Sequence, residues 1–477
     1  MRTDWLLLVN AMVGNFLSGL SARIFQISLP TVANGLGTDI LGISWAMISY
    51  QLAGISLSIL FGRLGDLYGR HVIYGLGFVV MTVSAFLCGL AGNVFQLIVF
   101  RFLQGVGGAM SQSAARVLGM EAMPEGSEGK ANGLMTMAFH SGFLVGPPVG
   151  GLLIDYIGWR WTFFLLVPIG LIGIVLTVMR LRGSQARETR GRLPSVDYVG
   201  AGLFIVCMVM LTLLLDRRSA ELVGLGQRGA LMAFAGTFLG FLVHESRAPS
   251  PMVNLSLFRI RMFSFSVLSL LIISITHSLV GFLMPFYLQE ILHLSPSVMG
   301  VIFLASPVFT ITLATASGHI SDHVGPRIPA SIGVLLTVAA FGIGTSLRSD
   351  SPWLLPTAMM ALLGLGTAFF NTPNQTAIIA SVPKAYRGFA TGMVHTIFGL
   401  GHMLGISVGG VLLTVMFQYY SGIPGATPSP DNPLAFVSSM NAAYLVCFGL
   451  GVAALFSSLM RGGARIAPRF RSADAGD

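Results

Sequence analysis

The chain has 477 residues, of which 54% are hydrophobic and only 9% are charged. An ordinary soluble domain carries about 25% charged residues, so this composition excludes a soluble enzyme and requires apolar surface that faces lipid. The net charge of +9 raises the alternative of nucleic-acid binding, which the placement of the basic residues decides.

Apolar runs of about 20 residues, the length that crosses a bilayer, predict an all-α membrane protein with about fourteen transmembrane helices. In chain order the predicted spans cover residues 6–30, 42–61, 72–92, 94–115, 133–156, 162–180, 197–215, 228–243, 264–288, 298–317, 329–347, 353–375, 389–417 and 437–459. The first run is too long for a cleavable signal peptide and has no small-residue cleavage site after it, so none is expected.

The basic residues lie mainly in alternate loops. Loops on the side of the N-terminus contain most of the lysines and arginines, including the Arg-rich segment 181–196. The opposite loops contain only Arg160, Arg217, Arg218, Arg228 and Arg348. This positive-inside bias predicts a plasma (inner) membrane protein with both termini cytoplasmic. It also accounts for the charge without a nucleic-acid partner.

Two glycine patterns recur in the same order in both halves of the chain. Gly62, Asp66, Gly69 and Arg70 correspond to Gly318, Asp322, Gly325 and Arg327. Gly142, Gly146, Gly150 and Gly151 correspond to Gly401, Gly405, Gly409 and Gly410. Duplicated helical halves are typical of secondary transporters, which bind substrate where the halves meet.

The repeat divides the chain into two pseudo-symmetric six-helix bundles with an inserted helix pair between them. The predicted boundaries are 1–180 for the first half, 181–196 for a cytoplasmic linker, 197–243 for the inserted pair, 244–262 for a second linker, 263–460 for the second half and 461–477 for a tail.

The first motif, from Gly62 to Arg70, is expected in a short loop between the second and third spans. There its glycines permit a tight turn, and Asp66 complements the positive N-terminus of a neighbouring helix. Arg101 and Gly105 lie in the fourth span. Because an arginine in mid-span costs about 2.5–3.5 kcal/mol, Arg101 should face the bundle interior and hold a partner; the alternative is that it extends to the outer membrane interface.

These motifs resemble those of the major facilitator superfamily. The stretch from Gly62 to Arg70 matches its loop signature, and Arg101 to Gly108 is similar to its buried-arginine motif. The run from His140 to Gly151, with Pro147 among its glycines, resembles the family's antiporter motif and is expected to pack tightly and to gate the outer side. The following Gly158 to Gly170 resembles the 14-span drug:proton antiporter branch. The resemblance implies alternating access and, in most of the family, a monomer.

The first span departs from that branch. Residues 20–30 read LSARIFQISLP, so the usual acid is replaced by Ser21, and Arg23 and Gln26 replace a threonine and an asparagine. No carboxylate falls clearly in mid-membrane. We therefore expect an electropositive site centred on Arg23 and an anionic or zwitterionic substrate. The alternative is that Arg23 extends toward the outer interface.

Other polar residues within the spans complete the candidate site. The titratable ones are His140, His277, His395 and His402, of which His140 and His402 are favoured because each accompanies a glycine-repeat helix. The uncharged candidates are Gln51 and Gln104 in the first half and Asn371, Asn374 and Gln375 around Pro373, where a kinked or unwound helix would expose backbone groups.

The sequence thus predicts a secondary transporter that exports a small organic molecule, with protons as the coupling ion. The alternatives are an uptake or facilitative carrier without proton coupling and, third, a non-transporting receptor. Cys88, Cys207 and Cys447 lie in apolar runs without metal-binding spacing, so we expect no metal and no cofactor. Nor does any nucleophile–base pattern favour an enzyme.

Overall fold

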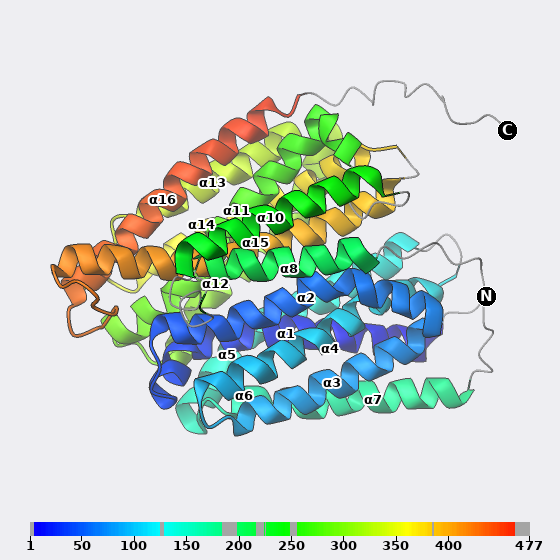
Figure 1. The fold of residues 1–477 in the computed structure, drawn as a ribbon, viewed down its shortest axis with the longest axis horizontal. Coiled ribbons are helices and arrows are strands. Elements are labelled where there is room, and N and C mark those ends of the chain that lie inside the picture. Colours follow the sequence, from blue (N-terminus) through cyan, green and yellow to red (C-terminus); the bar gives the residue numbers. More distant parts are fainter. Residues whose placement is uncertain are drawn as a thin grey trace.

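The computed structural model describes residues 4–124, 128–183, 198–215, 224, 226–248, 255–383 and 386–462. Within these ranges the chain is helical and contains no strand (Figure 1). The first half comprises α1 (Trp5–Gly35), α2 (Ile40–Tyr68), α3 (Arg70–Leu90), α4 (Val94–Glu121), α5 (Glu128–Tyr156), α6 (Trp161–Phe164) and α7 (Leu166–Gly183). Next come α8 (Tyr198–Leu215) and α10 (Gly226–Arg247).

The second half comprises η1 (Leu255–Arg259), α11 (Arg261–Phe286), η2 (Tyr287–Ile291), α12 (Pro296–Val324), α13 (Arg327–Gly344), α14 (Leu354–Ala380), α15 (Arg387–Ser421) and α16 (Pro433–Met460). Thirteen segments of the described chain are long and apolar enough to span a membrane, and α8 adds an apolar stretch at Val199–Leu214. The predicted all-α membrane fold of about fourteen spans is confirmed.

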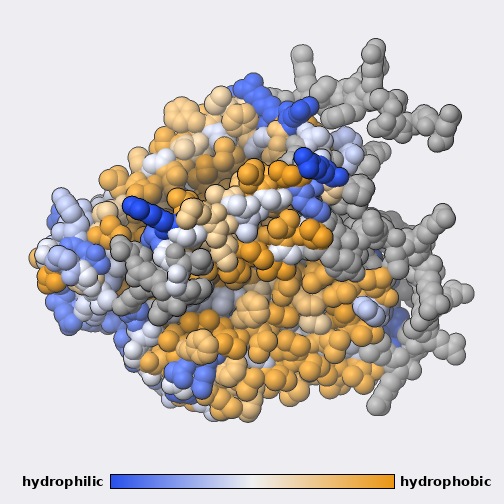
Figure 2. Space-filling model, viewed as in Figure 1, coloured by the Kyte–Doolittle hydropathy of each residue, from blue (hydrophilic) through white to orange (hydrophobic). Residues whose placement is uncertain are grey.

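The flank of the bundle is apolar. Figure 2 shows hydrophobic residues covering most of it, with hydrophilic residues gathered mainly toward the two ends. Large exposed hydrophobic side chains of the helices include Val83 on α3, Leu239 on α10 and Leu335 on α13. Because a soluble monomer rarely exposes an apolar surface of this extent, the flank is the lipid-facing surface of a multi-pass membrane protein.

The motif expected in the loop between the second and third spans lies instead in a helix. Residues from Gly62 to Tyr68 form the last turns of α2, and Gly69 alone separates α2 from α3. No proline interrupts the motif, so the helix continues until Gly69 adopts a φ of 96°, which glycine tolerates far better than other residues. Gly325, with a φ of 80°, makes the same kind of turn between α12 and α13.

The second glycine pattern packs equivalent helix pairs in the two halves. In the first half, a Cβ added at Gly142 would lie 2.1 Å from the backbone oxygen of Phe16 on α1. In the second half, a Cβ at Gly405 would lie 2.3 Å from the oxygen of Ile275 on α11. The backbones of α1 and α5, and of α11 and α15, therefore approach as closely as small residues allow.

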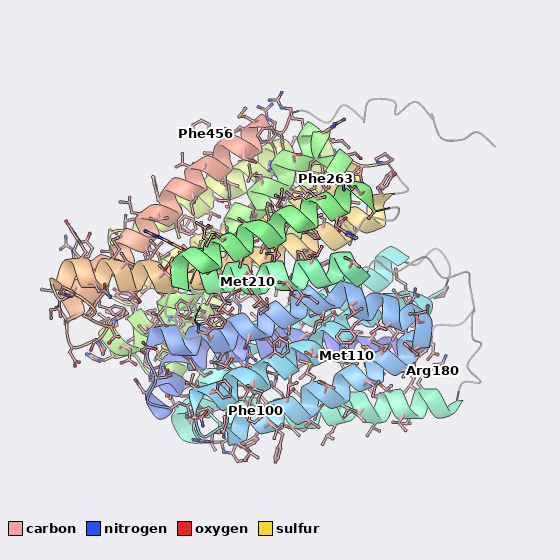
Figure 3. All side chains as sticks on the ribbon, viewed as in Figure 1. Phe100, Met110, Arg180, Met210, Phe263 and Phe456 are labelled. Carbon is pink, nitrogen blue, oxygen red and sulfur yellow. The ribbon has the colours of Figure 1, made fainter. Side chains whose placement is uncertain are left out.

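The described chain begins at Asp4 and ends at Gly462 at the same end of the bundle, which we call the chain-terminal end; the opposite end is the far end. At this end of the first half, Arg180 on α7, labelled in Figure 3, forms a 2.9 Å ion pair with Asp4, the residue before α1. In the second half, the Nε of Arg261 donates a 2.8 Å hydrogen bond to the oxygen of Met460. Figure 1 shows the two halves diverging toward this end.

Most of the predicted linker 181–196 and tail 461–477 lies outside the described residues, as do parts of the segment 244–262. The division of the chain at those boundaries stays a prediction.

Candidate substrate site

Arg23 lies at the centre of a cluster formed by α1 and α5. Its guanidinium carbon lies 3.8 Å from the centre of the Phe143 ring, a cation–π contact. Its Nη1 donates a 2.5 Å hydrogen bond to Oε1 of Gln26. A Cβ added at Gly146 would lie 3.0 Å from the Cβ of Arg23, so glycine leaves room for the arginine. Within the described chain Gln26 is the one acceptor found for the five N–H donors of Arg23, which leaves donors for a ligand.

Gln26 reaches across to the second half. It is 7% exposed, and its Nε2 would lie 2.2 Å from a Cβ added at Gly281 on α11. The missing side chain at Gly281 therefore admits the amide of Gln26 against the α11 backbone. Arg23 and Gln26 thus lie where the two halves meet, the place at which such transporters bind substrate.

Two histidines of the second half complete the cluster. His277 lies on α11 one turn before Gly281, and His402 lies on α15 beside it, where Ser278 Oγ donates a 2.8 Å hydrogen bond to the oxygen of His402. Both histidines lie close enough to Arg23 to interact with it electrostatically. We call Arg23, Gln26, Phe143, His277 and His402 the central cluster.

His277 makes two hydrogen bonds that fix its ring. Its Nδ1 lies 2.9 Å from the oxygen of Ile273 on the same helix. Its Nε2 lies 3.0 Å from Oγ1 of Thr367 on α14, and that hydroxyl lies 2.7 Å from the oxygen of Leu363. The imidazole therefore joins α11 to α14.

The charge of the central cluster is positive. Every acidic residue in a described helix lies near a helix end, so none lies in the middle of the bundle. Arg23 is accordingly not neutralised by a carboxylate there. A buried cation without a counter-charge is costly, and an anionic group of a ligand would remove that cost.

A second arginine, Arg101, lies inside the first half with a different role. It is 2% exposed and lies between the rings of Phe25 and Tyr50, each 4.4 Å from its guanidinium carbon. Its Nε donates to the oxygen of Ala46 at 3.3 Å, and its Nη1 donates to Oε1 of Gln104 at 2.7 Å. Arg101 thus joins α1, α2 and α4 rather than extending to the interface. Gly105 lets α4 approach α2 closely, because a Cβ added at Gly105 would lie 2.4 Å from the oxygen of Tyr50.

The far end is closed by contacts between the halves. Three hydrogen-bonded pairs join them there: Thr31 with Gln289, Asn34 with Glu290, and Asp155 with Ser297. Asp155 accepts from both the backbone N–H and the hydroxyl of Ser297 at the start of α12.

Glycines bring the same two helices, α5 and α12, together at the far end. A Cβ at Gly151 would lie 2.3 Å from the oxygen of Pro296, and a Cβ at Gly300 would lie 2.6 Å from the oxygen of Pro147. The glycine–proline motif of α5 therefore packs against α1 along most of its length and against the other half at its end. We call this contact, with the three hydrogen-bonded pairs, the far-end gate.

Other candidates from the sequence lie apart from the central cluster. Asn374 is fully buried and donates a 3.1 Å hydrogen bond to the oxygen of Ser266 on α11, which joins helices of one half. The helix around Pro373 is not unwound, because α14 runs through it without a break, and a kink there stays a prediction. Asn371 is half-buried, and Gln375 and His395 are exposed.

Gln51 and His140 are half-buried residues of the first half. The His140 ring contacts the neighbouring rings of Phe139 and Phe143, and Phe143 is the residue beneath Arg23. His140 therefore lies next to the central cluster but contributes no described hydrogen bond to it.

At the chain-terminal end, Arg70 forms a 3.1 Å ion pair with Glu121 on α4, and Arg327 is exposed at the start of α13. The side chains of Asp66 and Asp322 lie outside the described part of the structure, so their predicted pairing with helix termini stays a prediction. Gly62 lies nearly two turns before the end of α2, and a Cβ added there would lie 4.0 Å from the Cβ of Ser113 on α4.

Sequence reasoning missed three features of the site. Phe143 lies within the glycine motif of α5, but nothing in the motif indicates that it supports Arg23. Thr367 and Gly281 are single small residues on helices far from Arg23 in the sequence. The pairing of Asp155 with Ser297 joins residues 142 positions apart.

Comparisons with known proteins identify the family of the chain. The model of the Major Facilitator Superfamily matches residues 11–276 and 266–428. The chain is 29% identical to a riboflavin transporter of Clostridioides difficile, over 85% of this chain and 87% of the relative. It is 30% identical to a tetracenomycin C resistance and export protein of Streptomyces glaucescens, over 86% of this chain and 76% of the relative.

A solved structure shows the same fold. It is the crystal structure of a bacterial homologue of the human lysosomal transporter Spinster, in an inward-facing, occupied conformation, with a TM-score of 0.70, 14% identity and 97% of each chain covered. With matched halves around a central cluster and a family model over most of its length, the chain belongs to the Major Facilitator Superfamily and is a membrane transporter rather than an enzyme.

Proposed function

We propose that this transporter carries a small organic anion or zwitterion through a site between its halves. The observation that carries the proposal is the central cluster: Arg23 has unused donors and two histidines as neighbours, and the described helices place no acid in the middle of the bundle. A carboxylate, sulfonate or phosphate would accept the free guanidinium donors. Phe143 offers an apolar face beside them for the body of the molecule.

The proposed cycle is alternating access in a monomer. The distribution of basic residues supports a cytoplasmic chain-terminal end in the plasma membrane. On that orientation the far-end gate closes the outer side, and the state described is inward-facing. The halves would then rock around the central cluster so that the gate separates when the site opens outward.

Export is the first candidate for direction. The names of relatives that act in resistance and export support it, as does the glycine–proline motif of α5. The inside-negative membrane potential also favours the outward movement of an anion, by about 2.3 kcal/mol per charge at 100 mV. Export in exchange for protons would need a group for which proton and substrate compete.

Uptake or facilitated passage is the second candidate. The observation that favours it is Ser21, which occupies the position where the antiporter branch has an acid and is fully buried. Without that acid, a proton has no obvious site at which it would displace a cationic drug. The name of the riboflavin transporter supports a planar organic substrate in either direction.

Flux in proteoliposomes tests the substrate class and the direction. Benzenesulfonate and riboflavin 5′-phosphate serve as anionic probes, and ethidium serves as the cationic one. We expect saturable flux of at least one anion and none of ethidium. Ethidium flux by the wild-type protein would refute the proposed substrate class, and a protein that moves none of the probes or a wider solute panel would support a receptor.

An imposed pH gradient separates the modes of coupling. Proton antiport predicts that an acidic compartment drives the anion toward itself, whereas cotransport predicts that the anion moves with the protons. Facilitated passage predicts no effect of the gradient at zero membrane potential. Arg23→Gln and Arg101→Gln form a matched pair, since both remove a bundle arginine but only Arg23 lies in the central cluster.

A further inference from the structure

We propose that His277 is the proton-binding residue of this transporter and that a proton on His277 strengthens the binding of an anionic substrate in the central cluster. The inference rests on the proposed anionic substrate. It adds the residue that would take the proton and the sign of the coupling.

The hydrogen bonds of His277 fix one of its two ring protons. The oxygen of Ile273 is a carbonyl and can only accept, so Nδ1, at 2.9 Å, carries a proton whenever this hydrogen bond is made. The neutral ring therefore carries its single proton on Nδ1. Its Nε2 is then left with a lone pair directed at Thr367.

Thr367 has one hydroxyl proton and two possible acceptors. In the neutral state the hydroxyl must donate to Nε2 at 3.0 Å, and it then cannot donate to the oxygen of Leu363 at 2.7 Å. When Nε2 gains a proton, the direction of this bond reverses. Nε2 donates to Oγ1, and the hydroxyl turns to Leu363.

The protonated state thus satisfies every donor and acceptor of the relay. The chain of bonds runs from Nε2 through Oγ1 to the oxygen of Leu363, while Nδ1 keeps its bond to Ile273. No heavy atom has to move between the two states, because only the hydroxyl rotates. The heavy-atom geometry is therefore compatible with a second proton on His277.

The charged and ionisable groups around His277 determine whether a proton on its ring requires a counter-charge. Arg23 on α1 and His402 on α15 interact with His277 electrostatically. Helix α14, which supplies Thr367, carries no ionisable residue. The ionisable residues Tyr444 and Cys447 of α16 interact electrostatically with each other. Tyr444 also interacts with Tyr287, the residue that follows α11. From α13, the uncharged ring of Phe341 lies 6.5 Å from the imidazole.

A proton on His277 therefore adds a positive charge beside an arginine that has no carboxylate partner. An anion bound to Arg23 offsets that charge, so anion and proton favour each other's binding. Because linkage is reciprocal, acid must tighten anion binding by the same factor by which the anion tightens proton binding. Anion and proton then cross the membrane together, which is proton-coupled cotransport; it differs both from proton antiport and from a carrier without proton coupling.

The experiment uses full-length protein with 15N-labelled histidine, and His277→Gln identifies the His277 signals. Magnetic resonance reports which ring nitrogen carries the proton, without any ligand. We expect the neutral ring to be protonated on Nδ1. A neutral ring protonated on Nε2 would overturn the relay.

The second measurement is proton uptake on binding of benzenesulfonate or riboflavin 5′-phosphate, in weak buffer with a pH-indicating dye. Wild type should bind benzenesulfonate about tenfold more tightly at about pH 6 than at about pH 8, which by linkage requires uptake of about half a proton per anion bound, averaged over that range. His277→Gln should bind the anion with a weaker affinity that does not depend on pH, close to that of wild type at about pH 8, and without proton uptake. Thr367→Val should reduce both the uptake and the acid preference, and Thr367→Ser, which keeps the hydroxyl, should retain them.

His244→Gln, on α10 of the inserted pair, is the control and should behave as wild type. Anion binding by wild type without proton uptake, or equal uptake by His277→Gln, would overturn the inference while leaving the substrate class intact. If wild type binds neither anion, the proposed substrate class fails, and the coupling fails with it whatever the tautomer. A His277→Gln protein that does not fold is replaced by Thr367→Val, whose loss of uptake carries the same test.

Discussion

Replacing Gly151 by alanine should shift the transporter toward its outward-open state. A Cβ at this position would lie 2.3 Å from the oxygen of Pro296, 2.8 Å from its carbonyl carbon and 2.9 Å from the Cα of Ser297. Ordinary van der Waals contact begins at 3.4 Å, and all three atoms belong to backbone of the other half. The halves must therefore separate by about an ångström at the far-end gate, or the helices must bend.

The magnitude follows from the cost of overpacking. An extra methyl group in a well-packed contact costs about 1–3 kcal/mol. The cost applies only while the far-end gate is closed, because the contact is absent once the halves part. The ratio of open to closed gate should therefore rise by about 5- to 150-fold.

Gly364→Ala is the matched control. Its Cβ would lie 2.3 Å from the oxygen of Ser306, 2.8 Å from its Cα and 2.9 Å from its carbonyl carbon, but α12 and α14 belong to the same half. Overpacking there should lower the melting temperature without favouring either state. Gly151→Ala should lower it less, since opening of the gate relieves the strain.

The assay is the distance between spin labels at Tyr156→Cys and Leu434→Cys, two exposed residues at the far end of different halves. The three native cysteines are buried. Gly151→Ala should increase the population at long distance, and Gly364→Ala should not. Unchanged distances in Gly151→Ala, with the protein folded, would refute the assignment of this contact as the gate.

Asp155→Ala removes the oxygen that accepts both hydrogen bonds from Ser297 and should favour gate opening by about 1–3 kcal/mol, seen as the same increase in label distance; no increase would mean that the pair does not contribute to closure. Arg101→Lys keeps the charge but loses the planar contacts with two rings, so the thermal unfolding of the first half should begin at lower temperature, by an amount equivalent to about 1–3 kcal/mol. Gly325→Ala should cost about 1–2 kcal/mol because of its positive φ. Gly133→Ala, at a helical glycine with open space around it, should instead stabilise the protein by about 0.5–1 kcal/mol, and equal effects at the two glycines would contradict the explanation.

The sequence was sufficient for the spans, the repeat and the packing faces. Lipid requires a continuous apolar run for each span, so the positions of these runs in the sequence are enough to locate helices such as α1 and α11. The glycine repeats likewise predict close approach, since only small residues permit the distances found at Gly142 and Gly405. Both features depend on residues that lie close together in the sequence, so they can be predicted without knowing the fold.

The site was predicted only in part, because its contacts join distant segments. Arg23 stands out as a charge in a span, and the missing acid at Ser21 indicates the sign of the site. The partner of His277 could not be predicted, because Thr367 is 90 positions away and one of many hydroxyls. The motif at Gly62 was expected in a loop because it contains glycines and charges, but α2 continues through it until Gly69.

The affinity of Arg23→Gln for benzenesulfonate and riboflavin 5′-phosphate, measured by titration calorimetry beside wild type, tests the central claim most directly. A charge-assisted hydrogen bond contributes about 1.5–3 kcal/mol, so the anion that wild type binds should bind at least about tenfold more weakly to the variant. Arg101→Gln, compared at a temperature where it remains folded, should bind that anion like wild type. Equal affinity of Arg23→Gln and wild type would contradict an anion site centred on Arg23.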